Sequence, residues 1–142
     1  MNAARILPDL QASLLCEEVR QEITGNPFLI GIIQVLRLPR APIVVGRLCV
    51  FNRWTAGIGQ FTENVRFLAP DHTTILAKSE MKFELRDPAH HFTAVSFLGN
   101  LEFKTIGTYF IEVLVDDVMK LRYPVPVIVP QPQNPPAPPE KK

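Results

Sequence analysis

Apolar and polar residues alternate with a period of two along several segments of the chain, and this alternation predicts β-strands. In residues 81–86 every odd position is apolar and every even position is charged. Successive side chains of a strand point to opposite faces, so this segment is expected to bury one face and expose the other. In residues 109–115 the odd positions are again apolar, but only one even position is charged. The outer face of that strand is therefore expected to be partly covered.

Seven segments carry a strand pattern, and turn signals fall between them. The predicted strands are residues 28–38, 43–51, 60–68, 75–86, 92–97, 109–115 and 119–129. The turn signals are Gly25-Asn26-Pro27, Pro39-Arg40-Ala41-Pro42, Ala69-Pro70-Asp71-His72, Asp87-Pro88 and Gly99-Asn100. Proline fixes φ and glycine reaches positive φ, which is why both residues mark turns. Asp116-Asp117 lies between two apolar segments and predicts a hairpin turn.

The segment 10–22 is compatible with two structures. The spacing of Leu10, Leu14, Val19 and Ile23 suits an amphipathic helix, whereas residues 12–16 suit a first strand. We favour a strand that runs into a turn or a short helical segment.

Short strands separated by frequent turns are typical of sandwiches, and the helical patterns that a parallel α/β fold needs between strands are missing. The predicted fold is therefore all-β. We expect a two-sheet antiparallel sandwich, immunoglobulin-like or a similar Greek key, with about 7–9 strands.

Two local features refine this prediction. Gly107-Thr108-Tyr109 resembles a tyrosine corner, in which the tyrosine hydroxyl bonds to nearby backbone and the glycine supplies an unusual φ. Pro124 and Pro126 cannot donate to a ladder, so the last strand is expected to lie at a sheet edge.

The sequence predicts three parts: an N-terminal lead-in at residues 1–9, a β-sandwich domain at residues 10–129, and a proline-rich, flexible tail at residues 130–142. Six of the thirteen residues in the tail are proline, which suits an extended polyproline II segment. No secretory signal pattern is seen near the start, and no segment reaches the roughly 18 apolar residues of a membrane helix. A cytoplasmic location is therefore expected.

Composition and charge narrow the classes of partner. The chain has 142 residues, 46% of them hydrophobic, and a formal net charge of +1. Lysine and arginine are scattered, so nucleic-acid and membrane-surface partners are not expected, while a protein partner or self-association is compatible with the sequence. Cys16 and Cys49 lie in apolar segments and are expected to be small core residues, with a disulfide as the alternative.

The sequence contains no recognisable catalytic or metal-binding motif. His90 and His91 follow Asp87, but adjacent residues of a strand point to opposite faces, and exposed loop histidines are the favoured interpretation. Gly57-Ile58-Gly59 lacks the context of a phosphate loop and predicts a bend. No cofactor, metal or catalytic residue is predicted, and the chain is expected not to be an enzyme.

Four residues are candidates for an interaction surface: Arg53, Trp54, His90 and His91. Trp54 follows a predicted strand and precedes a glycine-containing loop. Tryptophan and arginine are frequent at binding hot spots, although a core tryptophan is the favoured interpretation of Trp54.

Several motifs resemble a bacterial family of unknown function with short β-sandwich proteins, over most of residues 7–129. They are Leu14-Leu15-Cys16-Glu17-Glu18-Val19, Phe28-Leu29-Ile30-Gly31-Ile32-Ile33, Leu101-Glu102-Phe103, Gly107-Thr108-Tyr109, Val113-Leu114-Val115-Asp116-Asp117 and Tyr123-Pro124-Val125-Pro126-Val127. The hairpin of that family usually reads Asp-Gly, whereas this chain has Asp116-Asp117. The resemblance implies a cytoplasmic bacterial sandwich and supplies no catalytic residues.

A non-enzymatic interaction module is the function that these observations favour. The alternatives are a sandwich that binds a ligand, either a carbohydrate or a metal, and a structural subunit of a phage or secretion assembly. The second alternative would use unpaired strand edges for assembly between copies.

Overall fold

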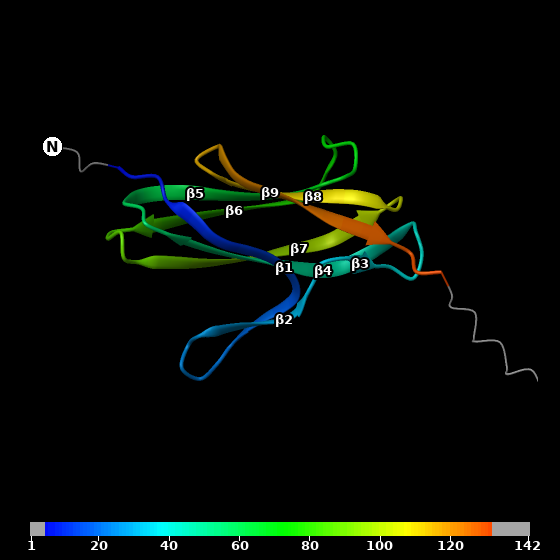
Figure 1. Ribbon diagram of the computed structural model, residues 1–142, viewed down its shortest axis with the longest axis horizontal. Helices are drawn as coiled ribbons and strands as arrows, with labels where there is room; N and C mark the ends of the chain where they lie inside the picture. The colour runs from blue at the N-terminus through cyan, green and yellow to red at the C-terminus, as the bar shows by residue number, and fades with distance from the viewer. Residues whose placement is uncertain (1–4, 132–142) are drawn as a thin grey trace, which may run out of the picture.

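The computed structural model describes residues 5–131, and within that range the chain forms nine β-strands and no helix (Figure 1). The strands are β1 (Asp9–Gln21), β2 (Pro27–Ile32), β3 (Leu36–Arg37), β4 (Ile43–Thr55), β5 (Gly59–Leu68), β6 (Ile75–Leu85), β7 (His91–Phe103), β8 (Gly107–Val115) and β9 (Val118–Ile128). The predicted all-β class is confirmed. Residues 1–4 of the expected lead-in and residues 132–142 of the expected proline-rich tail lie outside the described residues.

The strands form two sheets that face each other as two layers (Figure 1). One has four strands in the order β2-β1-β4-β7, and the other has five in the order β3-β9-β8-β5-β6. Every pairing in the four-stranded sheet is antiparallel. The five-stranded sheet is mixed, because Leu36 and Arg37 of β3 pair in parallel with Val127 and Ile128 of β9. The expectation of purely antiparallel sheets was therefore wrong at this edge.

The predicted strand 28–38 is in fact two strands in different sheets. Gly31 adopts a φ of +68°, which regular strands do not tolerate, and the backbone N–H of Ile33 donates to the carbonyl of Leu15 as β2 ends. Residues 33–35 then carry the chain from the edge of one sheet to the edge of the other. This crossover was concealed by a mostly apolar pattern, interrupted only by Gly31, Gln34 and Arg37.

Aromatic side chains fill the core between the two layers. Trp54 of β4 stacks on Phe83 of β6 at a ring-centroid distance of 5.7 Å, and Phe83 stacks in turn on Phe92 of β7 at 4.8 Å. Phe67 of β5 meets Phe103 of β7 edge-on at 5.8 Å. Each contact joins one sheet to the other, so the pairs resist separation of the layers.

The tyrosine corner is confirmed. The hydroxyl of Tyr109 donates to the carbonyl of Thr105 at 2.7 Å, and Gly107 has a φ of +151°. The predicted hairpin turn is also confirmed, since Asp116 and Asp117 both have positive φ and connect β8 directly to β9. Positive φ at both central positions is typical of a two-residue hairpin turn.

Gly99-Asn100 is not a turn, and this prediction was wrong. Both residues lie inside β7, opposite the part of β4 that contains Gly46. The buried positions of β7 change there from even, ending at Leu98, to odd, beginning at Leu101. Asn100 has a φ of +52°. Glycine within a strand often marks a bend. The Gly99-Asn100 pair therefore marks a kink in β7 next to Gly46 of the paired strand β4, and not a turn between strands.

The last strand is an edge along only part of its length. Between Val118 and Val125, no strand in residues 5–131 pairs with the side of β9 that faces away from β8. At Val127 and Ile128, however, β3 covers that side. Pro124 lies in the part of β9 that has no strand on its outer side, and Pro126 directly precedes the residues that pair with β3. Proline has no backbone N–H, so at these positions few or no hydrogen bonds between strands are lost.

The strand β1 belongs to the core sheet for only half of its length. It pairs with β4 from Asp9 to Cys16, and from residue 17 onward its only strand partner in residues 5–131 is β2. The helical alternative for residues 10–22 is therefore wrong. Residues 17–32 form a hairpin arm that leaves the two layers, as the blue strands in Figure 1 show.

We predict that Tyr109→Phe lowers the free energy of unfolding by about 1 kcal/mol, because it deletes a part-buried hydrogen bond to the Thr105 carbonyl. Urea unfolding followed by fluorescence measures the change. An unchanged midpoint and slope would show that the corner contributes nothing to stability.

Candidate functional site

The four residues predicted as an interaction surface do not form one surface, although Arg53 and His91 are diagonal neighbours on the paired strands β4 and β7. Trp54 is fully buried between the sheets, which removes it from any surface, and β4 continues past it to Thr55. Arg53 points to the opposite, outer face of the same strand and is half-buried. His90 and His91 are exposed where β7 begins, and the hydroxyl of Thr55 donates to the carbonyl of His90 at 3.2 Å. Within residues 5–131, no group of three potential ligands is arranged to hold a metal ion.

The indole of Trp54 donates to a buried carboxyl group. Its Nε1 lies 2.5 Å from Oε2 of Glu63, and Nδ2 of Asn52 donates to the same oxygen at 3.3 Å. Ser96 on β7 is also buried near Glu63. A polar cluster of Asn52, Trp54, Glu63 and Ser96 therefore lies in the core, with no side chain of the cluster reaching solvent.

Burial raises the pKa of Glu63 above its ordinary value of 4.5, while the hydrogen bonds from Trp54 and Asn52 act in the opposite direction. Burial is the larger effect, because transfer of a charged carboxylate out of water is costly. Oδ1 of Asn52 and Oγ of Ser96 have no hydrogen-bond partner of normal geometry. A protonated Glu63 would supply a donor to a cluster that has buried acceptors without a partner, which suits a neutral carboxyl at this position.

Glu63 was missed at the sequence level, although the pattern contained a signal. It occupies an odd position of β5, with Phe61, Val65 and Phe67 on the same buried face. A single charge on an otherwise apolar face predicts either a buried polar partner or a functional group. The partners, Asn52 and Trp54, come from another strand and could not be identified from spacing.

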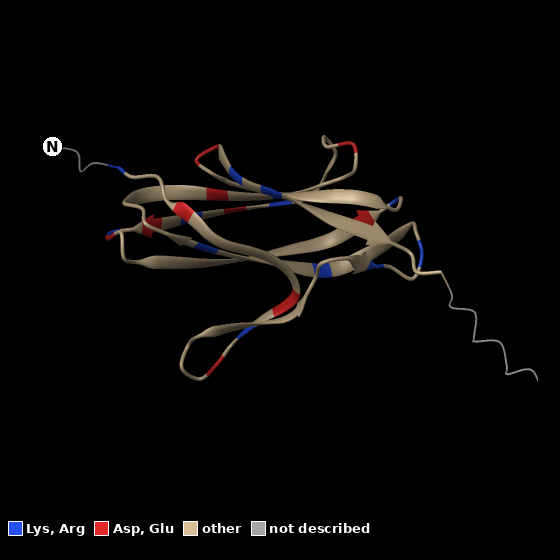
Figure 2. Cartoon of the chain, viewed as in Figure 1, with Lys and Arg blue, Asp and Glu red and all other residues tan. Residues whose placement is uncertain are grey.

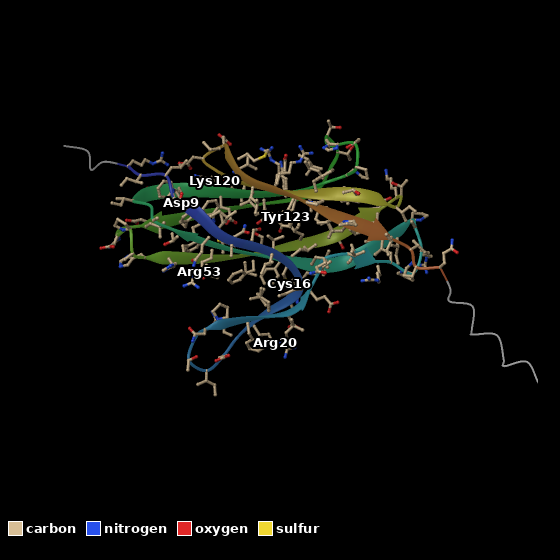
Figure 3. All side chains as sticks on the ribbon, in the orientation of Figure 1. Asp9, Cys16, Arg20, Arg53, Lys120 and Tyr123 are labelled. Carbon is tan, nitrogen blue, oxygen red and sulfur yellow. The ribbon has the colours of Figure 1, made fainter. Side chains whose placement is uncertain are left out.

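Cys16 and Cys49 are direct partners across β1 and β4, and both are buried, free thiols. Burial and the nearby Cys49 raise the pKa of Cys16 to about 11. Sγ of Cys49 lies 3.6 Å from the carbonyl oxygen of Glu17, where the arm begins. The preferred prediction of small core thiols is confirmed, and both thiols lie where β1 ends its pairing with β4; Figure 3 labels Cys16 at this point.

The arm and the outer face of the four-stranded sheet expose large apolar side chains. Ile23 at the tip of the arm is fully exposed, Phe28 is 40% exposed and Ile32 is 53% exposed. On the outer face of β7, Phe97 is 58% exposed and lies under the guanidinium of Arg47. We call the arm (residues 17–32), with its exposed side chains Ile23, Phe28 and Ile32 and the neighbouring Phe97, the arm surface.

A cleft of about 280 Å³ separates the arm from the outer face of β7. Val19 and Pro27 line it from the arm, and Val95 and Phe97 line it from the sheet. The arm therefore bends back toward its own sheet, and Figure 3 places Arg20 on the arm, beyond Cys16.

A larger hollow of about 970 Å³ lies beside the first half of β4. Ile43 and Val45 line it from β4, and Ile33 and Val35 line it from the crossover that leads to β3. Glu17, Arg37 and Arg47 also border it. We call this hollow the β4 groove. Charges are otherwise dispersed over both sheets without a continuous patch of one sign in the view of Figure 2.

We predict that Glu63→Gln becomes more stable relative to wild type as pH rises. A carboxyl with a raised pKa stabilises the fold fully below the unfolded value of 4.5 and loses that contribution as pH rises through the folded-state pKa. Unfolding free energies of both proteins between about pH 4 and pH 9 measure this. Glu80→Gln, on an exposed position of β6, is the matched control. A difference between Glu63→Gln and wild type that stays constant with pH would contradict the assignment.

We also predict that Glu63→Leu is less stable than Glu63→Gln by about 1–3 kcal/mol at every pH, since leucine leaves the buried donors of Trp54 and Asn52 without an acceptor. Comparison of the two variants in the same unfolding experiment separates charge from hydrogen bonding. A Glu63→Leu protein as stable as Glu63→Gln would show that the donors need no acceptor.

Comparison with known proteins supplies a family for this chain. Within the described residues, no helix is long and apolar enough to cross a membrane. No curated protein matches the chain. A family model described as a family of unknown function, DUF6941, matches residues 11–128, which include all of β2 to β9 and most of β1. The expected resemblance to a family of unknown function is thereby confirmed, and the chain belongs to the family DUF6941.

Proposed function

We propose that this protein is a non-enzymatic module that binds another protein through the arm surface. The observation that carries the proposal is the exposure of Ile23, Phe28 and Ile32 on a hairpin that leaves the body of the domain. Single exposed apolar residues are ordinary, but several large ones on one projecting element are typical of interaction sites. Burial of this apolar area against a partner would release water that the free arm orders.

The chemistry of the arm is consistent with a protein partner. Glu18 and Arg20 form an ion pair with a distance of 3.0 Å between Oε1 and Nε, so the arm offers a polar rim beside its apolar side chains. Protein interfaces commonly combine an apolar centre with a polar rim. Phe97 adds an aromatic side chain on the neighbouring sheet face.

We infer an immunoglobulin-like or related Greek-key sandwich from the two facing sheets and from the hydrogen bond of Tyr109 to Thr105. A cytoplasmic location in a bacterium is proposed from the sequence. The free thiols of Cys16 and Cys49, adjacent yet unbridged, support a reducing compartment.

A structural subunit that associates with its own copies is the second candidate. The projecting arm favours it, because an exposed hairpin can insert into a neighbouring copy. A sandwich that binds carbohydrate is supported less well, since Trp54, the only tryptophan in the chain, is buried and offers no stacking surface.

Site-specific photo-crosslinking in cells that produce the protein tests the interaction role. A crosslinker at Phe28 is expected to capture one reproducible protein, whereas a crosslinker at Val118, which is comparably exposed on β9, captures none of it. Binding of that protein, once purified, should weaken by at least about tenfold in the Ile23→Ser/Phe28→Ser variant, a loss of about 1.4 kcal/mol.

The stability of this variant should stay within about 0.5 kcal/mol of wild type, because the side chains are exposed. Val118→Ser is the control variant and should bind normally. Equal capture from Phe28 and Val118, or unchanged affinity in the double variant, would contradict the arm surface as the binding site. Capture of a second copy of the chain would favour the structural subunit.

A further inference from the structure

The four-stranded sheet lacks a strand beside the first half of β4. That strand pairs with β7 along its whole length, from Ile43 to Thr55. It pairs with β1 only from Cys49 to Thr55. Within residues 5–131, no strand pairs with residues 43–48 of β4 on the side that β1 has left. Residues 43–48 of β4 therefore pair with a strand on one side only, as the residues of an edge strand do, although β4 is an interior strand of its sheet.

The β4 groove lies at this open edge. Its volume of about 970 Å³ is bordered on one side by Ile43 and Val45 and on the other by Ile33 and Val35. Ile33, Ile43 and Val45 are only partly buried, although all three pack against the core. The core at this end of the domain is thus incompletely covered, and the groove exposes it beside unpaired backbone.

An extended peptide fits these two features together. The open edge of β4 offers backbone N–H and C=O groups at the strand spacing, and only an extended chain presents matching groups. Alternate side chains of such a peptide would point into the groove and complete the burial of Ile43 and Val45. A span of six residues corresponds to about 20 Å of strand, close to the length of an average strand.

The charged side chains that border the β4 groove indicate which residues should flank the apolar part of a bound peptide. Arg37 and Arg47 border the groove, and within residues 5–131 neither is part of an ion pair. Glu17 is the only acidic residue along the border, and its side chain lies against Gly31. The border therefore favours acidic residues beside the apolar segment of a ligand.

The segment 130–142 of the chain is a poor match for the site. Six of its residues are proline, which cannot donate to a ladder, and its last two residues are lysines. A partner strand from another protein is therefore the better occupant.

We propose that the β4 groove is a strand-addition site, which binds an extended segment of a partner protein along residues 43–48 of β4. The segment has alternating apolar side chains, no proline in its central part, and an acidic residue beside it. This inference rests on the interaction role proposed above but assigns it a second surface, which shares Ile32 with the arm surface and includes neither Ile23 nor Phe28.

Selection from a phage-displayed library of random peptides of about eight residues tests the proposal on the whole chain. Enriched peptides are expected to alternate apolar residues, to lack central proline and to carry Asp or Glu at one end. Lack of enrichment, or enrichment of proline-rich or basic peptides, would overturn the proposal.

The most enriched peptide is then synthesised in three forms: one normal, and two that are N-methylated at alternate backbone positions, one for each alternate set. Strand addition predicts at least about tenfold weaker binding of whichever methylated form removes the donors that face β4, about 1.4 kcal/mol. Both alternate methylation patterns are made, and equal binding of all three peptides would overturn the proposal.

Charge reversal tests the border. Arg37→Glu/Arg47→Glu should weaken binding severalfold, whereas Lys82→Glu, exposed on β6 of the other sheet, should leave it unchanged. Ile23→Ser/Phe28→Ser should also bind the peptide normally. Loss of binding in this arm variant alone would place the peptide on the arm surface, which would overturn the groove assignment while supporting the interaction role.

Residue-resolved hydrogen exchange identifies the binding site without any substitution. The peptide should slow exchange in residues 43–48 and leave residues 19–28 unchanged. Protection confined to the arm would overturn the proposal. Protection of residues 43–48 without peptide, appearing only as protein concentration rises, would identify a second copy as the occupant instead.

Discussion

The point at which β1 separates from β4 determines the shape of this protein. Pairing between the two strands is limited by Cys16 and Cys49, and Cys49 lies three residues after Gly46 in the chain order of β4. At that position β4 and β7 bend together, with Asn100 in a left-handed conformation. A strand that paired with residues 43–48 of β4, on the far side of this bend from Cys49, would have to bend as well. β1 does not follow the bend and continues into the arm. The arm and the β4 groove are therefore two results of one kink.

The core tolerates this open end because its other end is strongly held. Trp54, Phe83 and Phe92 stack across the two sheets, and Glu63 accepts hydrogen bonds from Trp54 and Asn52. A buried polar cluster is costly unless its members are paired, but a paired cluster also specifies which strands face each other. The domain thus joins a half whose aromatic core is packed between the sheets to a half where apolar side chains and a strand edge remain uncovered.

Most of the fold could be predicted from the sequence, because it depends on local rules. Alternation predicted β6 and β8, and the glycine and tyrosine of the corner predicted a bond that the structure contains. The errors arose where long-range geometry decides. Gly99-Asn100 has the composition of a turn, but pairing with β4 keeps it inside a strand. Residues 28–38 have one apolar pattern, yet they serve two sheets.

The candidate sites were harder to predict for the same reason. Trp54 was considered for a surface because its predicted strand ended too early, whereas β4 carries it into the core. The arm surface and the β4 groove have no motif of their own, since each results from the absence of pairing between two strands. Only Glu63 left a signal in the pattern, as the one charge on a buried face of β5.

Residue-resolved amide hydrogen exchange of the free protein tests the central claim most directly, namely that β4 is paired on both sides in one half and on one side in the other. The structure predicts slow exchange throughout residues 49–55. In residues 43–48 it predicts slow exchange for amides directed toward β7 and fast exchange for those directed toward the open side. Uniformly slow exchange along all of β4, at a concentration where the protein is monomeric, would contradict it.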